Sequence, residues 1–144
     1  MSASISEIIS VLNSISNIRT AKQLDKLAAA VERIASTDEP LPTVEPLLQI
    51  FERHPDSDGH VIFWSMLNTI EAIPGYESYL LSSIRRMPSN FSLLMINRMM
   101  NSGVIDVEGV NLFSLLADIE TDTQYPKKIR KTAGYYLEYQ RGKA

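Results

Sequence analysis

Residues 51–103 have the sequence FERHPDSDGHVIFWSMLNTIEAIPGYESYLLSSIRRMPSNFSLLMINRMMNSG, which contains the clearest helical pattern of the chain. Three amphipathic segments follow one another here, separated by the breaker sequences PDSDG, PG and MPSN. The stretch also holds the only Trp, both His and five of the six Met. Its first segment, from about His60 to Ile73, is apolar on more than one face. We therefore expect a central helix here, with neighbours on both sides.

Helix-start and helix-end signals extend this pattern in both directions. Ser4 and Thr20 are each followed three residues later by Glu or Gln, a capping-box spacing that predicts two helices before the central stretch. Further caps or starts are expected at Thr43, at Ser89 or Asn90, at Asp106 and at Pro126, with Gly103 ending a helix. No segment alternates apolar and polar residues with period two over a useful length, so we expect no sheet.

About eight helices result, and short turns favour antiparallel neighbours. The expected pairs cover 4–36, 43–73, 76–102 and 107–141, in a single all-α domain over residues 1–144. Such regular spacing resembles helical-hairpin repeats of the HEAT type, in which each pair buries its apolar face on the next. The pairs share no sequence motif, so a compact α-bundle of the same helices stays open as the alternative.

Composition limits the classes of function. The chain has 144 residues, a net charge of −3, 44% hydrophobic residues and no Cys, which excludes disulfides and thiol chemistry. No apolar run reaches the length of a membrane span, and the N-terminus lacks a basic signal-peptide region, so we expect a cytoplasmic protein without membrane contact. Residues 1–125 carry 16 acidic against 8 basic side chains, which argues against direct nucleic-acid binding. The basic residues 126–144 are interpreted as a solvated last helix.

The turn HPDSDGH invites a metal hypothesis because His54, Asp56, Asp58 and His60 lie close together in sequence. The calcium-loop pattern fails, since counting from Asp56 puts neither Gly nor Glu at the required positions. A turn whose Asp side chains bond their own backbone is favoured. No nucleophile triad or phosphate loop is present, and the acid–base candidates are Glu71 and the turn that holds His54 and His60. We expect no metal, no cofactor and no catalysis, although a small helical enzyme or metal protein stays open.

Charged side chains on the two most apolar segments are more informative. Glu71 lies near Trp64 in the helical pattern, and Arg98 lies among Met and Ile residues. A charge on a buried helix must be paired or reach the surface. We therefore expect a Glu71–Arg98 ion pair, or both side chains on a concave surface beside Trp64. Tyr76 next to Glu77 fits a partner-facing patch of aromatic and charged residues, or the rim of a core.

Residues 51–103 resemble bacterial immunity proteins of polymorphic-toxin and contact-dependent growth-inhibition systems, in particular the family catalogued as immunity protein 30. The resembling pieces are FERHP with the Asp-rich turn, VIFWSMLNTIEAIPGYE and SIRRMPSNFSLLMINRMMNSG. The resemblance implies a monomer that binds the C-terminal domain of a cognate toxin as a 1:1 complex and blocks it without catalysis.

An acidic helical body can be steered to a basic toxin by long-range attraction. The expected partner-binding residues are Asp56, Asp58, Trp64, Glu71, Tyr76 and Glu77. The modest net charge makes a mimic of DNA a weak interpretation, so covering the toxin's active site or an exosite is equally compatible. The alternative function is a HEAT-like adaptor or scaffold of a bacterial complex, with no toxin encoded beside it.

Overall fold

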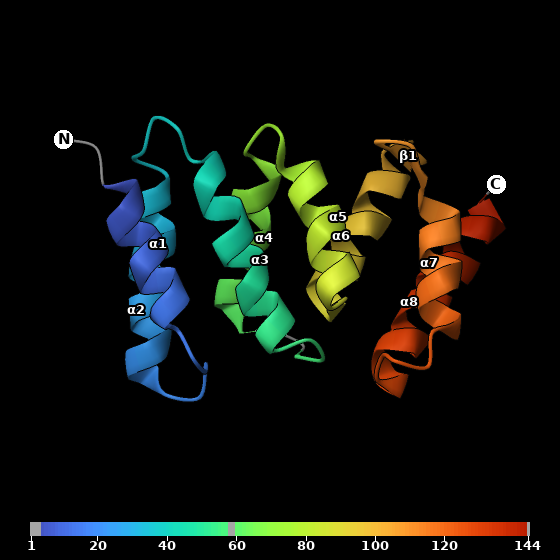
Figure 1. Cartoon of the computed structure of the whole chain (residues 1–144), viewed down its shortest axis with the longest axis horizontal. Coiled ribbons are helices and arrows are strands. Elements are labelled where there is room, and N and C mark those ends of the chain that lie inside the picture. The colour runs from blue at the N-terminus through green and yellow to red at the C-terminus, as the bar shows by residue number, and fades with distance from the viewer. Residues whose placement is uncertain (1–3, 58–59, 144) are drawn as a thin grey trace.

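The computed structural model describes residues 4–57 and 60–143, and these residues form the all-α fold that the sequence predicts. The helices are α1 (Ile5–Ser14), α2 (Ala21–Ile34), α3 (Val44–Arg53), α4 (Val61–Glu71), α5 (Tyr76–Arg86), α6 (Asn90–Asn101), α7 (Leu112–Thr121) and α8 (Lys127–Lys143). A 3₁₀ turn, η1 (Leu41–Thr43), precedes α3, and a hairpin of β1 (Asp106–Val107) and β2 (Val110–Asn111) precedes α7. Figure 1 shows the helices along the long axis, with α1 and α8 at opposite ends.

Consecutive helices pack as the four expected pairs, and the pairs stack into two layers. The odd layer (α1, α3, α5 and α7) faces the viewer in Figure 1, and the even layer (α2, α4, α6 and α8) lies behind it. Within the odd layer α3 contacts α1 and α5, and within the even layer α4 and α6 each contact the even helix on either side. The fourth pair joins the third mainly through α8 on α6. The even layer is therefore continuous from α2 to α8.

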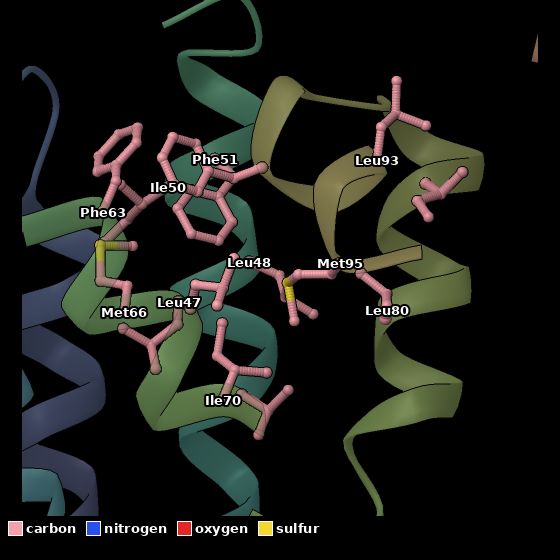
Figure 2. Packing of buried hydrophobic residues seen from close by; sticks show 14 of the residues in the cluster. Leu47, Leu48, Ile50, Phe51, Phe63, Met66, Ile70, Leu80, Leu93 and Met95 are labelled. Atoms are coloured by element: carbon pink, nitrogen blue, oxygen red, sulfur yellow. The ribbon is translucent and has the colours of Figure 1, made fainter. Parts of the chain in front are cut away.

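The core is one cluster of buried hydrophobic side chains that extends from Ile8 in α1 to Leu137 in α8. Its centre is a group of three phenylalanines from three helices. The ring of Phe51 lies 5.1 Å from that of Phe63 and 5.2 Å from that of Phe91. Figure 2 shows Phe51 and Phe63 above a layer of aliphatic side chains from α3 and α4. Burying such rings provides the largest favourable contribution to folding.

Several of the expected caps are confirmed. The side chains of Ser4 and Thr20 accept hydrogen bonds from the backbone N–H three residues on, at 3.4 and 3.2 Å. Ser89 forms a full capping box with Ser92, because each side chain accepts from the other's backbone N–H. Gly103 has φ +93°, the left-handed conformation that suits glycine after a helix.

One expected cap is confirmed in position only, and another is wrong. Thr43 is the N-cap residue of α3, as expected, but its hydroxyl donates to the carbonyl of Pro40 at 2.7 Å in η1 and makes no capping hydrogen bond to α3. Asp106 does not cap α7, because it lies in β1 opposite Asn111, and Asn111 caps the helix through Ser114 N at 3.0 Å.

The expectation of no sheet is also wrong, although the sheet is small. Its two strands are two residues long, and they are joined by Glu108 and Gly109, both at positive φ. A two-residue turn of this kind favours Asn or Asp before Gly. Because this chain has Glu at that position, the usual sequence pattern of a hairpin turn is absent. Strands this short show no period in the sequence.

Candidate functional site

Exposed apolar side chains concentrate on the even layer. Within the described residues, large exposed hydrophobic side chains are those of Val61, Trp64, Ile105, Tyr135 and Tyr139. Four of these five lie on α4 and α8, which both pack against α6. The central helix α4 has α2 and α6 as neighbours on its two sides, as expected, yet Val61 is 84% exposed and Trp64 46%, so part of its apolar surface faces solvent. Trp64 lines one groove with Tyr135, and Tyr135 lines another with Tyr139, so exposed apolar surface is grouped here, as is typical of binding sites.

A groove of about 400 Å³ opens between α4, α6 and α8 on this layer, and we call it the aromatic groove. Its lining residues are Trp64, Asn90, Phe91, Leu94, Lys131, Thr132, Tyr135 and Tyr136. The Trp64 ring packs edge-on against Phe91, with 5.3 Å between centroids. Trp64 is thus held from below by the core while part of its ring stays accessible, which suits an anchor for a binding partner.

Buried polar contacts fix the walls of the aromatic groove. At one end, the backbone N–H of Asn90 donates to the carbonyl of Pro55 at 2.7 Å, which ties the start of α6 to the turn before α4. At the other end, the buried Gln140 of α8 donates to Asn97 Oδ1 at 2.7 Å and to Asn101 Oδ1 at 2.9 Å on α6. Because these contacts hold the three helices in register, little ordering of the groove is needed when a ligand binds.

The ion pair expected from the sequence joins α4 to α6. Arg98 donates through Nε to both carboxylate oxygens of Glu71, at 3.1 and 3.0 Å, and through Nη2 to Oε1 at 2.9 Å. The hydrogen bond to Glu71 raises the pKa of Arg98 above its ordinary value, although partial burial opposes this. Glu71, Arg98 and Tyr76 line a hollow of about 470 Å³, which we call the ion-pair hollow. Burial raises the pKa of the Tyr76 phenol, and Glu71 and Glu77 raise it further.

A second hollow, of about 460 Å³, adjoins this pair, and we call it the acidic hollow. It lies between the start of α5 and the β1–β2 hairpin, and its lining includes the carboxylates of Glu77, Asp106 and Glu108. Tyr76 and Met99 line both hollows. The acidic hollow would suit a cationic group of a partner protein.

The six expected partner-binding residues do not form one patch. Glu71 lines the ion-pair hollow and Glu77 the acidic hollow, and Tyr76 lines both. Trp64 lies about 10 Å from Glu71, two turns back along α4. Asp56 is exposed in the turn before α4, near the Trp64 end, and Asp58 lies outside the described residues. The set therefore divides between the two ends of α4.

Sequence reasoning missed the contribution of α8. Lys131 and Tyr135 line the aromatic groove, and Tyr139 continues the same face one turn further. The available signal was their spacing at i, i+4 and i+8, which puts all three on one side of a helix. The basic residues 126–144 are therefore more than a solvated end of the chain, since one of their lysines lines a groove.

The two histidines of the HPDSDGH turn have different surroundings. His54 Nδ1 lies 3.1 Å from the carbonyl oxygen of Ile50, and its ring meets Phe63 edge-on, whereas His60 is exposed at the start of α4. Across residues 4–57 and 60–143, no three His, Asp or Glu side chains are grouped so that they could hold a metal ion.

Compared with models of protein families, with curated proteins and with solved structures, the chain shows no significant similarity to any of them. The resemblance of residues 51–103 to an immunity family therefore stays a prediction. In the part of the chain that the structure describes, no helix combines the length and the apolar character that crossing a membrane requires.

Proposed function

We propose that this protein is a cytoplasmic bacterial immunity protein, which binds a cognate toxin domain and neutralises it without catalysis. The observation that supports a binding function is the exposure of Val61, Trp64, Tyr135 and Tyr139 on one layer around the aromatic groove. Tryptophan and tyrosine dominate the energetics of protein interfaces, because they bury a large area with few rotatable bonds. The toxin as partner rests on the resemblance of residues 51–103.

The charge distribution favours one orientation of the toxin on the proposed interface. Glu77, Asp106 and Glu108 at the acidic hollow would attract a basic toxin surface and raise its association rate. Trp64 and Tyr135, beyond the Glu71–Arg98 pair, would then supply the contacts that slow dissociation. On this proposal the toxin lies along α4 and α6, with its basic part toward the hairpin.

The experiment is co-expression with the toxin domain encoded immediately upstream of this gene. We expect the protein to restore growth and to co-purify with the toxin domain as a 1:1 complex. The Trp64→Ala and Tyr135→Ala variants should lose most of this protection. Val11→Ala provides the control, because Val11 is a partly exposed hydrophobic residue of α1 in the odd layer, away from both the aromatic groove and the acidic hollow.

The growth assay also separates the proposal from an adaptor function. If cells die equally with and without the protein, the immunity proposal is wrong. If no toxic domain is encoded upstream, the same exposed face would fit an adaptor, since stacked helical pairs commonly bind partners along one extended surface.

A further inference from the structure

The aromatic groove lies in the basic part of the molecule, although the chain as a whole is acidic. Lys131 lines the groove, and Lys128 is exposed one turn earlier on α8. Residues 126–144 carry six basic side chains and one acidic side chain. The exposed aromatic side chains are therefore framed by cations, whereas the carboxylates gather at the acidic hollow.

The helix ends around the groove are N-terminal ends, which carry partial positive charge like the lysines. Asn90 and Phe91 are the first two residues of α6, Trp64 is the fourth residue of α4, and Lys131 is the fifth residue of α8. The groove thus lies near the N-terminal turns of three helices, where the helix dipoles favour negative charge. The carboxylates of Asp56, in the turn before α4, and Glu138, on α8, are exposed and screened by water, and the groove lining contains no Asp or Glu.

We propose that the aromatic groove binds an acidic segment of the partner protein. An apolar or aromatic side chain of that segment enters between Trp64 and Tyr135, and its carboxylates pair with Lys131 and Lys128. The inference deepens the proposed function and rests on it for the identity of the partner. It assigns opposite charges to two parts of the partner surface, acidic at the groove and basic at the acidic hollow.

A protein segment is favoured over single-stranded nucleic acid, which aromatic and basic side chains can also bind. A nucleic-acid backbone repeats its negative charge at every phosphate and needs a continuous track of cations. Here Lys131 is the basic residue of the groove lining and Lys128 lies one turn earlier on the same helix, so the cations do not form a continuous track. A short acidic segment with one apolar anchor needs only the two lysines and the aromatic lining.

The experiment uses the fluorescence of Trp64, which is the only tryptophan of the chain and lines the groove. The probes are a synthetic peptide of Glu, Leu and Phe, the same peptide with Lys in place of Glu, and single-stranded oligo-dT. We expect the acidic peptide to shift the Trp64 emission saturably. Lys131→Glu should weaken this binding about three- to tenfold, because it reverses a charge beside the ligand.

Lys22→Glu is the matched control, because it makes the same charge change at an exposed lysine on α2, away from the groove. It should change the affinity less than about twofold if only long-range charge is altered. Circular dichroism of all variants checks that the helices are retained.

Three results would overturn the inference: no response of Trp64 to the acidic peptide, tighter binding of the Lys peptide, or oligo-dT binding that depends on Lys131 while the acidic peptide does not bind. These readouts need no toxin, so they separate this inference from the proposed function. Toxin neutralisation that is unaffected by Lys131→Glu would contradict the groove inference alone, and a failure to neutralise would contradict the proposed function alone.

Discussion

The two layers of helices each contain an arginine–glutamate pair, and the two pairs differ in what surrounds them. In the odd layer, Arg86 of α5 binds Glu52 of α3 through Nε and Nη2, and Glu45 through Nη1. The buried Ser83 donates to the same Glu52 carboxylate at 2.8 Å. In the even layer, Arg98 binds Glu71 with similar distances but on a face that also exposes Trp64.

The surroundings of the two pairs indicate which layer of helices has a surface available for binding. The Glu52 side chain is 13% exposed and binds both an arginine and a buried hydroxyl, so its loss would leave Ser83 without that partner. The Glu71 side chain is 20% exposed and, among the described residues, its hydrogen bonds are with Arg98 and not with a buried hydroxyl. The arginines of both pairs reach water, at 37% exposed for Arg86 and 45% for Arg98, so the difference lies in the carboxylate and its neighbours. We interpret the odd-layer pair as part of the structure and the even-layer pair as part of a surface kept available for binding.

The largest expected effect is on stability, and it comes from comparing two neighbouring residues of α4, one facing the core and one facing the aromatic groove. Phe63 is fully buried against Phe51 and Phe91, and Trp64 points to the aromatic groove. Phe63→Ala should lower the free energy of unfolding by about 3–5 kcal/mol, measured by urea denaturation. Trp64→Ala should lower it by about 1–2 kcal/mol, because the side chain is already 46% exposed and loses only part of a buried surface together with the edge contact with Phe91. Equal losses would mean that Trp64 belongs to the core and that the even layer has no open face.

An intermediate effect compares the two ion pairs directly. Glu52→Ala should lower the free energy of unfolding by about 1–3 kcal/mol, because Ser83 is left as a buried unsatisfied hydroxyl. Glu71→Ala should lower it by less than about 1 kcal/mol, as is usual for an exposed pair. In a double-mutant cycle, Ser83→Ala should recover part of the Glu52→Ala loss, since both partners of the hydrogen bond are then removed. A Glu71→Ala loss as large as that of Glu52→Ala would contradict the distinction between the layers.

Local signals predicted most of the fold, because they act within one or two turns of the chain. Capping side chains at Ser4, Thr20 and Ser89, and breakers such as Pro74-Gly75, set the helix limits. The regular spacing of the pairs then gave their order. The hairpin at 106–111 escaped because its strands are too short to show a period.

The aromatic groove could be predicted only in part, because it depends on contacts between distant segments. Trp64 was predicted as a partner-binding residue, but periodicity identifies the apolar faces of α4 without revealing which of them a neighbour leaves open or which other residues lie beside Trp64. Its proximity to Tyr135 follows from the packing of α8 on α6, which Gln140 and Asn97 help to fix. The Glu71–Arg98 pair was predictable, because a charge on an apolar helix needs a partner and few were available.

The smallest expected effect concerns the pH dependence of the open face. Burial, together with Glu71 and Glu77, raises the pKa of Tyr76 above its ordinary value of 10.0, so the fold favours the neutral phenol. The stability from this preference is fully present below about pH 10 and is lost as the pH rises through the folded-state pKa. Urea denaturation should therefore show that the free energy of unfolding falls less between about pH 9 and about pH 11 in Tyr76→Phe than in the unmodified protein.

Tyr136, whose pKa burial also raises, provides the comparison for this titration. Tyr136→Phe should likewise reduce the alkaline loss of stability, but only Tyr76 lies beside the Glu71–Arg98 pair. We therefore expect Glu71→Gln to shift the titration curve of tyrosinate absorbance when Tyr76 is present and to shift it less in the Tyr76→Phe variant. The change in the double variant is then smaller than the sum of the changes in the two single variants. The same Glu71→Gln change should leave the effect of Tyr136→Phe additive, because Tyr136 titrates at the aromatic groove, at the other end of the face. If the effect of Glu71→Gln simply adds to that of Tyr76→Phe as well as to that of Tyr136→Phe, Glu71 influences neither tyrosine. That result would contradict the division of this face into an acidic hollow and a basic, aromatic groove.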